Sequence, residues 1–265
     1  MRHNVLKVIA GINNFRLDQI VKLVKASELV FADYIDIAAN YRLVSIIKSI
    51  SNLPVCASSI EPLELYNCVL AGADLVELGN FDTFYSSNIY LSADEILKLA
   101  IETRSLLPHT YLSVTIPHVL SLDEQVKLSI NLENIGVNML QTEGYNTSKI
   151  LKNINSKYND NFLSSTTQAS SALSSLNVIT QVVSIPVIAA SGFNSISSSI
   201  ARSYKSFGVA IGSYLKKYNN LIDISCRLHE IIRSLSYQNI KYSNDDCFYL
   251  RMNALNLNKS IIIKR

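Results

Sequence analysis

Two short apolar runs near the end of the chain carry the pattern most suggestive of chemistry. They read S-I-P-V-I-A-A-S-G-F-N-S from Ser184 to Ser195 and G-V-A-I-G-S-Y-L from Gly208 to Leu215. Each is typical of a buried parallel strand that ends in small residues and glycine. At such ends, main-chain amides stay open to a ligand, and a helix start contributes its positive dipole end. The pattern predicts an anion site at Ser191, Gly192, Phe193, Gly212 and Ser213, although tight turns need glycine in any case.

Polar and charged residues inside other apolar runs indicate a second kind of chemistry. An unpaired charge in the helix-facing layer of a barrel would be costly, so these side chains are expected to point into the barrel. The inward set has one cation, two or three carboxylates and several neutral hydrogen-bonding groups, which suits proton transfer on a small polar substrate. The candidates for acid–base work are Lys7, Asp36, Glu77, Glu143 and His118.

Each candidate also has a purely structural interpretation. Lys7, Asp36 and Glu77 could form a buried ion-pair layer that satisfies only itself. His118 could cap a helix or face solvent. Gln141 and the asparagines that follow strands, Asn13, Asn14 and Asn80, lie at the predicted ligand-binding rim, but an asparagine there can simply cap a turn.

The elements that must position these residues alternate strictly between strand and helix. This alternation predicts a parallel sheet, and eight units predict a closed single (β/α)8 TIM barrel over residues 1–237, with a C-terminal extension over 238–265. The expected strands span Val5–Ile12, Tyr34–Ala39, Pro54–Ile60, Asp74–Gly79, Tyr111–Ile116 and Val137–Gly144, followed by the two glycine-ended runs.

The expected helices follow the strands at apolar spacings of three and four residues. Two of them open with capping boxes, at Ser92 to Glu95 and at Ser121 to Glu124. A polar stretch, Tyr145–Gln168, is predicted to be a long loop and a lid over the barrel, or else a tolerated surface insertion, with the helix resuming over Ala172–Val183.

Composition limits the class of protein. The chain has 265 residues, of which 48% are hydrophobic and 17% charged, so it can bury a large core. A net charge of +3 is too small to argue for nucleic acid, and no apolar run is long enough for a membrane span. The four cysteines show no metal-ligand spacing, so we expect no metal site and reduced thiols.

Several motifs resemble the family called hypothetical chloroplast reading frame twenty-three. They are K-V-I-A-G-I-N-N-F, Y-I-D-I-A-A, A-G-A-D-L-V-E-L-G-N-F-D-T-F-Y, L-S-V-T-I-P-H, S-L-D-E-Q-V, Q-T-E-G and I-P-V-I-A-A-S-G-F. The resemblance covers nearly all of the chain through the eighth strand, and departs from the family after Gly144. It implies a plastid location in the stroma and an aldolase-type or ribulose-phosphate-binding barrel whose activity is not assigned.

Three functional hypotheses follow. The first is an enzyme, a lyase or isomerase, that acts on a small phosphorylated metabolite and uses the acid–base candidates above. A lysine–imine mechanism would require Lys7, because the sixth strand offers Met139 and Gln141 where barrel aldolases commonly carry the lysine. The second is a flavin mononucleotide (FMN) enzyme that holds the cofactor's phosphate at the same loops. The third is a non-catalytic barrel that senses a phosphorylated metabolite and binds a partner protein. The sequence leaves the oligomeric state open.

Overall fold

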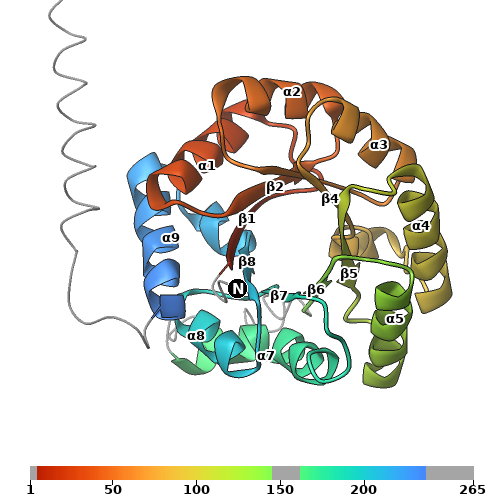
Figure 1. Cartoon of the computed structure of the whole chain (residues 1–265). Helices are drawn as coiled ribbons and strands as arrows, with labels where there is room; N and C mark the ends of the chain where they lie inside the picture. The colour runs from red at the N-terminus through yellow and green to blue at the C-terminus, as the bar shows by residue number, and fades with distance from the viewer. Residues whose placement is uncertain (1–4, 145–161, 237–265) are drawn as a thin grey trace, which may run out of the picture.

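A computed structural model describes residues 5–144 and 162–236 and contains a closed barrel of parallel strands (Figure 1). The strands pair in chain order, and β1 closes the barrel against β8. Their bounds are β1 Val5–Gly11, β2 Tyr34–Ala38, β3 Val55–Ser59, β4 Leu75–Leu78, β5 Tyr111–Ile116, β6 Met139–Thr142, β7 Val187–Ala190 and β8 Gly208–Ile211. The predicted (β/α)8 barrel is confirmed.

Helices form an outer ring around the strands, and α9 lies beside α1 where the ring closes (Figure 1). Three short 3-10 helices, η1 Phe81–Thr83, η2 Tyr85–Ser87 and η3 Ser213–Lys217, follow β4 and β8. The α-helices of the described residues are α1 Leu17–Val30, α2 Tyr41–Ile50, α3 Pro62–Leu70, α4 Ala93–Leu106, α5 Leu122–Asn134, α7 Phe162–Ile179, α8 Ser195–Ser203 and α9 Leu221–Ser236.

Local sequence signals explain several of these bounds. Both predicted capping boxes are present: Ser92 and Ser121 accept from the amides of Glu95 and Glu124, whose side chains accept in return. Gly208 is required where β8 meets β1, because a Cβ there would lie 2.2 Å from the carbonyl oxygen of Val5. Ser92 and Ser121 thus define the starts of α4 and α5, and Gly208 allows β8 to pair closely with β1.

The helix before β7 differs from its prediction. It begins at Phe162, ten residues before the expected start at Ala172, and ends at Ile179. Its buried face includes Ser165, Ala169 and Leu176, at helical spacing. The serines on this buried face lower the local hydropathy, so the helical spacing of apolar residues was not recognised. Stretches of small polar residues are instead typical of loops. The predicted loop and lid, Tyr145–Gln168, therefore overlaps α7 from residue 162 onward. Its remaining part, 145–161, lies outside the described residues, as does the extension at 238–265.

Two apolar clusters lie on the two sides of the barrel wall. The larger one fills the space between strands and helices. The smaller one lies inside the barrel and contains Tyr34, Cys56, Met139, Ile188, Ala190 and Ala210. Burial raises the pKa of the Cys56 thiol well above its ordinary value, so this cysteine behaves as a small neutral core residue. Polar side chains at other interior positions form part of the candidate site.

Candidate functional site

A cavity of about 130 Å³ lies at the carboxyl ends of the strands. Its lining comes from the residues at or just after the ends of β1, β4, β5, β6, β7 and β8. In a barrel of this kind, that end is where ligands bind. The predicted residues that line the cavity are Asn80, Gln141, Glu143, Ser191, Gly192, Phe193, Gly212 and Ser213. The remaining candidates, Lys7, Asp36, Glu77, His118, Asn13 and Asn14, lie outside this lining.

The chain turns sharply after β7. Ser191 and Gly192 have φ angles of +76° and +78°, and a left-handed serine is a strained conformation. A Cβ at Gly192 would lie 2.2 Å from the carbonyl oxygen of Gln168 in α7, so only glycine fits. The turn places two small residues at the cavity wall, where a ligand can approach the main chain closely.

Main-chain donors at these turns are open. Among residues 5–144 and 162–236, no acceptor pairs with the amides of Gly192, Phe193, Gly212 and Ser213. A main-chain amide at a concave surface needs a partner from solvent or ligand. The ends of β7 and β8 therefore carry four amides without a partner in the described chain, on residues that all line one cavity.

A helix start follows the β7 turn as expected, and its first amides are already paired. The side chain of Asn194 accepts from the amides of Ile196 and Ser197, at 2.9 and 3.1 Å. The first turn of α8 is thus capped by its own chain. An anion at this site would be held by the loop amides before the helix.

Lys216 is a residue that the sequence analysis missed. It lies in η3, directly after the second glycine-ended strand, and it is the one basic residue among the described residues that line the cavity. The pair Lys216-Lys217 following Gly212 was the available signal, because a short extra helix after the eighth strand commonly completes a phosphate site in this fold.

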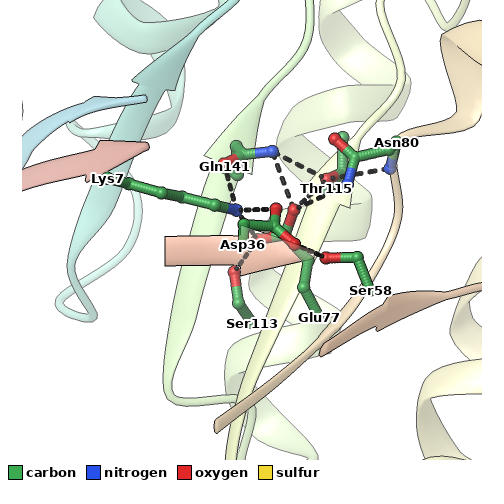
Figure 2. A network of polar contacts seen from close by, with 8 residues as sticks. All are labelled: Lys7, Asp36, Ser58, Glu77, Asn80, Ser113, Thr115 and Gln141. Atoms are coloured by element: carbon green, nitrogen blue, oxygen red, sulfur yellow. Dashed lines mark hydrogen bonds and ion pairs between the residues drawn. The ribbon is translucent and has the colours of Figure 1, made fainter. Parts of the chain in front are cut away.

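Below the cavity, Lys7 is enclosed by polar side chains (Figure 2). Its Nζ lies 2.7 Å from Oε2 of Glu77 and 2.8 Å from Oδ2 of Asp36. It also donates to Oε1 of Gln141, at 2.8 Å. Lys7 and Glu77 are 0% exposed, and Asp36 is 1% exposed. The inward direction predicted for these side chains is confirmed.

The carboxylates of this layer have further donors. Ser58 donates to Asp36. Ser113 donates to Oε2 of Glu77 at 2.8 Å, and Nε2 of Gln141 donates to Oε1 at 2.8 Å (Figure 2). Buried charges are tolerated when they are paired and hydrogen-bonded in this way. The layer is therefore closed on itself, with Gln141 joining it to the cavity floor.

Electrostatics favour the ammonium form of Lys7 in this layer. Burial alone lowers the pKa of Lys7, but the facing Asp36 and Glu77 outweigh it and raise that pKa well above its ordinary value. Burial raises the pKa of Glu77, against the opposing effect of Lys7. A lysine held as ammonium is a poor nucleophile, so this geometry disfavours an imine at Lys7.

Glu143 lies at the cavity wall, with both carboxylate oxygens occupied. Oε1 accepts from the amide of Asp82 at 2.8 Å. Oε2 accepts from the hydroxyl of Tyr85 at 2.5 Å and from the amide of His118 at 3.2 Å, and it lies 3.0 Å from Nδ1 of His118. Glu143 thus ties the segments after β4 and β5 to β6.

Asp82 is the second residue that the sequence analysis missed. It lines the cavity from η1, and its backbone is held by Glu143. Asp82 is an exposed residue, and its carboxyl group accepts from the amide of the adjacent Thr83. Desolvation by the surrounding protein raises the pKa of Asp82 to about 6; Glu143 adds to the rise, and His118, Lys216 and the Thr83 amide oppose it.

The predicted rim asparagines divide into two groups. Asn14 caps a turn: its Nδ2 donates to the carbonyl of Ala10 at 3.2 Å, and its Oδ1 accepts from the amide of Arg16 at 3.1 Å. Asn13 is exposed beside it. Asn80 lines the cavity in a left-handed conformation, with φ of +62°. Of these three asparagines, only Asn80 lines the cavity.

Eight parallel strands with a polar cavity at their carboxyl ends define a (β/α)8 barrel with a candidate ligand site. Residues 1–241 match the family model "Protein of unknown function (DUF561)". The chain belongs to this family.

Curated relatives carry the name "Uncharacterized protein ycf23". The Antithamnion protein is 48% identical over 267 residues, covering 99% of this chain and 96% of its own length. The Cyanophora paradoxa protein is 37% identical over 237 residues, covering 89% and 94%. These relatives are plastid-genome reading frames, and the chain is a plastid protein. Among the described residues, no helix has the length and apolarity needed to cross a membrane.

Solved structures share the fold at low sequence identity. A thiamine phosphate pyrophosphorylase from Pyrococcus furiosus has a TM-score of 0.57 at 16% identity, covering 90% of this chain and 98% of that chain. GGGPS from Thermoplasma volcanium has a TM-score of 0.60 at 13% identity, covering 90% and 94%. The geranylgeranylglyceryl phosphate synthase of Thermoplasma acidophilum, in complex with its substrate sn-glycerol-1-phosphate, has a TM-score of 0.57 at 12% identity, covering 88% and 94%.

Proposed function

We propose that this protein binds a small phosphorylated metabolite at the carboxyl end of its barrel. The observation that carries the proposal is the convergence of the β7 and β8 loops on one cavity. Open amides at Gly192, Phe193, Gly212 and Ser213 supply hydrogen-bond donors, and Lys216 supplies a positive charge. Donors of this kind together with a cation suit a phosphate dianion.

Cavity size favours a short ligand. A volume of about 130 Å³ is below the roughly 300–1,000 Å³ of sites for larger organic ligands. A phosphate with a few carbon atoms fits such a space, whereas the three-ring system of FMN would have to project from it. The Thermoplasma acidophilum barrel, whose bound substrate is a three-carbon phosphate, supports a ligand of this class by analogy of fold. The FMN hypothesis stays a prediction without a supporting observation.

The polar wall opposite the loops favours an enzyme over a sensor. Asp82 and Glu143 lie on the same cavity as the proposed phosphate loops, so a bound ligand would meet carboxyl groups as well as donors. Acid–base chemistry of the lyase or isomerase type needs such a group beside the carbon skeleton. The non-catalytic hypothesis predicts binding without turnover.

A thermal-shift comparison of matched compounds tests the binding proposal. We expect glycerol phosphates or other short-chain sugar phosphates to raise the melting temperature by about 5 °C or more at a hundred times the dissociation constant, since such a ligand adds about 2.7 kcal/mol. Glycerol and the parent sugars, which lack phosphate, are the controls and should have no effect. Equal stabilisation by the unphosphorylated compounds would contradict the anion site.

A further inference from the structure

The carboxyl groups proposed for acid–base work fall into separate environments. Glu77 and Asp36 are sealed in the layer around Lys7 and do not line the cavity. Glu143 does line it, but its oxygens already accept from Asp82, Tyr85 and His118. A carboxylate that holds two loops in place cannot exchange a proton with a ligand without releasing them. Among the described residues that line the cavity, this leaves Asp82 as the carboxyl group that does not tie distant segments together, since the amide bonded to its side chain belongs to the next residue, Thr83.

Asp82 also lies within the field of the proposed phosphate site. Lys216 and the β8 loop line the same small cavity, and Lys216 is close enough to influence the charge on Asp82. The charged and titratable groups that surround Asp82 are Glu143 directly after β6, His118 after β5, Tyr85 on η2 and Lys216 on η3. An anion bound at the loops would add negative charge beside this carboxyl group and favour its protonated form.

We propose that Asp82 is the acid–base residue of this cavity, that it carries a proton when an anion occupies the β7 and β8 loops, and that Glu143 positions it. The inference rests on the proposed binding function and specifies the ligand as a short-chain phosphate ester with a carbonyl group near Asp82. The protonated carboxyl gives its proton to the carbonyl oxygen of the ligand. The resulting carboxylate then takes a proton from the neighbouring carbon, which leaves an enol and restores the acid.

Sulfate is the probe that isolates this proton, because it remains a dianion between pH 5 and pH 8. Rising pH ionises Asp82 and adds a negative charge beside the bound sulfate. We expect wild-type affinity to fall about tenfold from pH 5 to pH 7.5, measured by calorimetry at constant ionic strength. Near pH 6.5, buffers with different ionisation enthalpies should report net proton uptake on binding.

Four variants separate Asp82 from its neighbours. Asp82→Asn should bind sulfate with an affinity that changes less than twofold over this range. His118→Gln should keep the pH dependence. Glu143→Gln should move its midpoint to lower pH, because the charge of Glu143 helps to raise the pKa of Asp82, after burial. Asp94→Asn, an exposed site at the start of α4, should behave as wild type.

The outcomes distinguish the two proposals. Sulfate binding that does not depend on pH in the wild type, or that depends on pH equally in Asp82→Asn, would overturn the role of Asp82 and leave the anion site in place. Loss of the pH dependence in His118→Gln alone would assign the proton to His118 and also overturn it. Absence of sulfate binding at every pH would remove the anion site, and this inference with it.

Discussion

Replacing Lys7 with methionine is expected to lower the free energy of unfolding by about 3–5 kcal/mol at pH 8. The substitution removes the one cation that contacts both Asp36 and Glu77 and leaves two carboxyl groups inside the barrel without it. Stability of a whole domain is about 5–15 kcal/mol, so this single change would remove a large part of it. Urea denaturation followed by circular dichroism measures the loss.

The loss should depend on pH with a definite sign. Burial raises the pKa of Glu77, and removal of Lys7 takes away the effect that opposes this rise. The native state of the variant then binds more protons than the unfolded state, so its stability falls as pH rises. We therefore expect a smaller deficit at pH 5 than at pH 8.

A neutralised layer is the matched control. The triple variant Lys7→Met, Asp36→Asn and Glu77→Gln carries no charge at these positions, and it should recover at least half of the stability lost in the single variant. A single variant within 1 kcal/mol of wild type, or a deficit that is equal at the two pH values, would show that the layer does not act as a charged unit.

Replacing Lys216 with methionine is expected to weaken the binding of inorganic phosphate by about 10- to 100-fold. A hydrogen bond to a charged group contributes roughly 1.5–3 kcal/mol, which corresponds to that range. The long aliphatic stem is kept, so packing around η3 should change little. Calorimetry at constant ionic strength measures the change.

Lys217 provides a control of equal charge one residue away. Its Nζ lies 5.9 Å from the ring centroid of Tyr214, and it does not line the cavity. Lys217→Met should therefore change the affinity less than twofold. If both variants weaken binding equally, the effect comes from net charge near the cavity mouth, and Lys216 does not contact the phosphate.

Much of the fold could be predicted because local signals and the global fold agree. Charged residues inside apolar strands revealed which side chains point inward, since only the barrel interior can pair them. The capping boxes at Ser92 and Ser121 marked helix starts that the structure contains. The start of α7 was missed because its buried face uses serine and alanine, which pack closely without a hydrophobic signature.

The site was less predictable because its contacts join distant segments. Asp82 and Glu143 are 61 residues apart, and only the closed barrel brings η1 against β6. No spacing rule in the sequence could show that both oxygens of Glu143 are occupied.

The capping of α8 by Asn194 could have been predicted, because asparagine before a serine-rich helix start is a typical N-cap. Lys216 lies three residues after Ser213 of the predicted anion site, so its contribution to that site could also have been predicted.

An amide-resolved titration with inorganic phosphate tests the central claim most directly. In ¹H–¹⁵N spectra of the whole chain, the amide signals of Gly192, Phe193, Gly212 and Ser213 should shift together and saturate with one dissociation constant, because all four would donate to the same anion. Sulfate, which should bind the same amides, should displace phosphate and replace these shifts with those of the sulfate-bound protein. Saturable shifts elsewhere with these four unchanged, or no saturable shift at all, would contradict a phosphate site at the ends of β7 and β8.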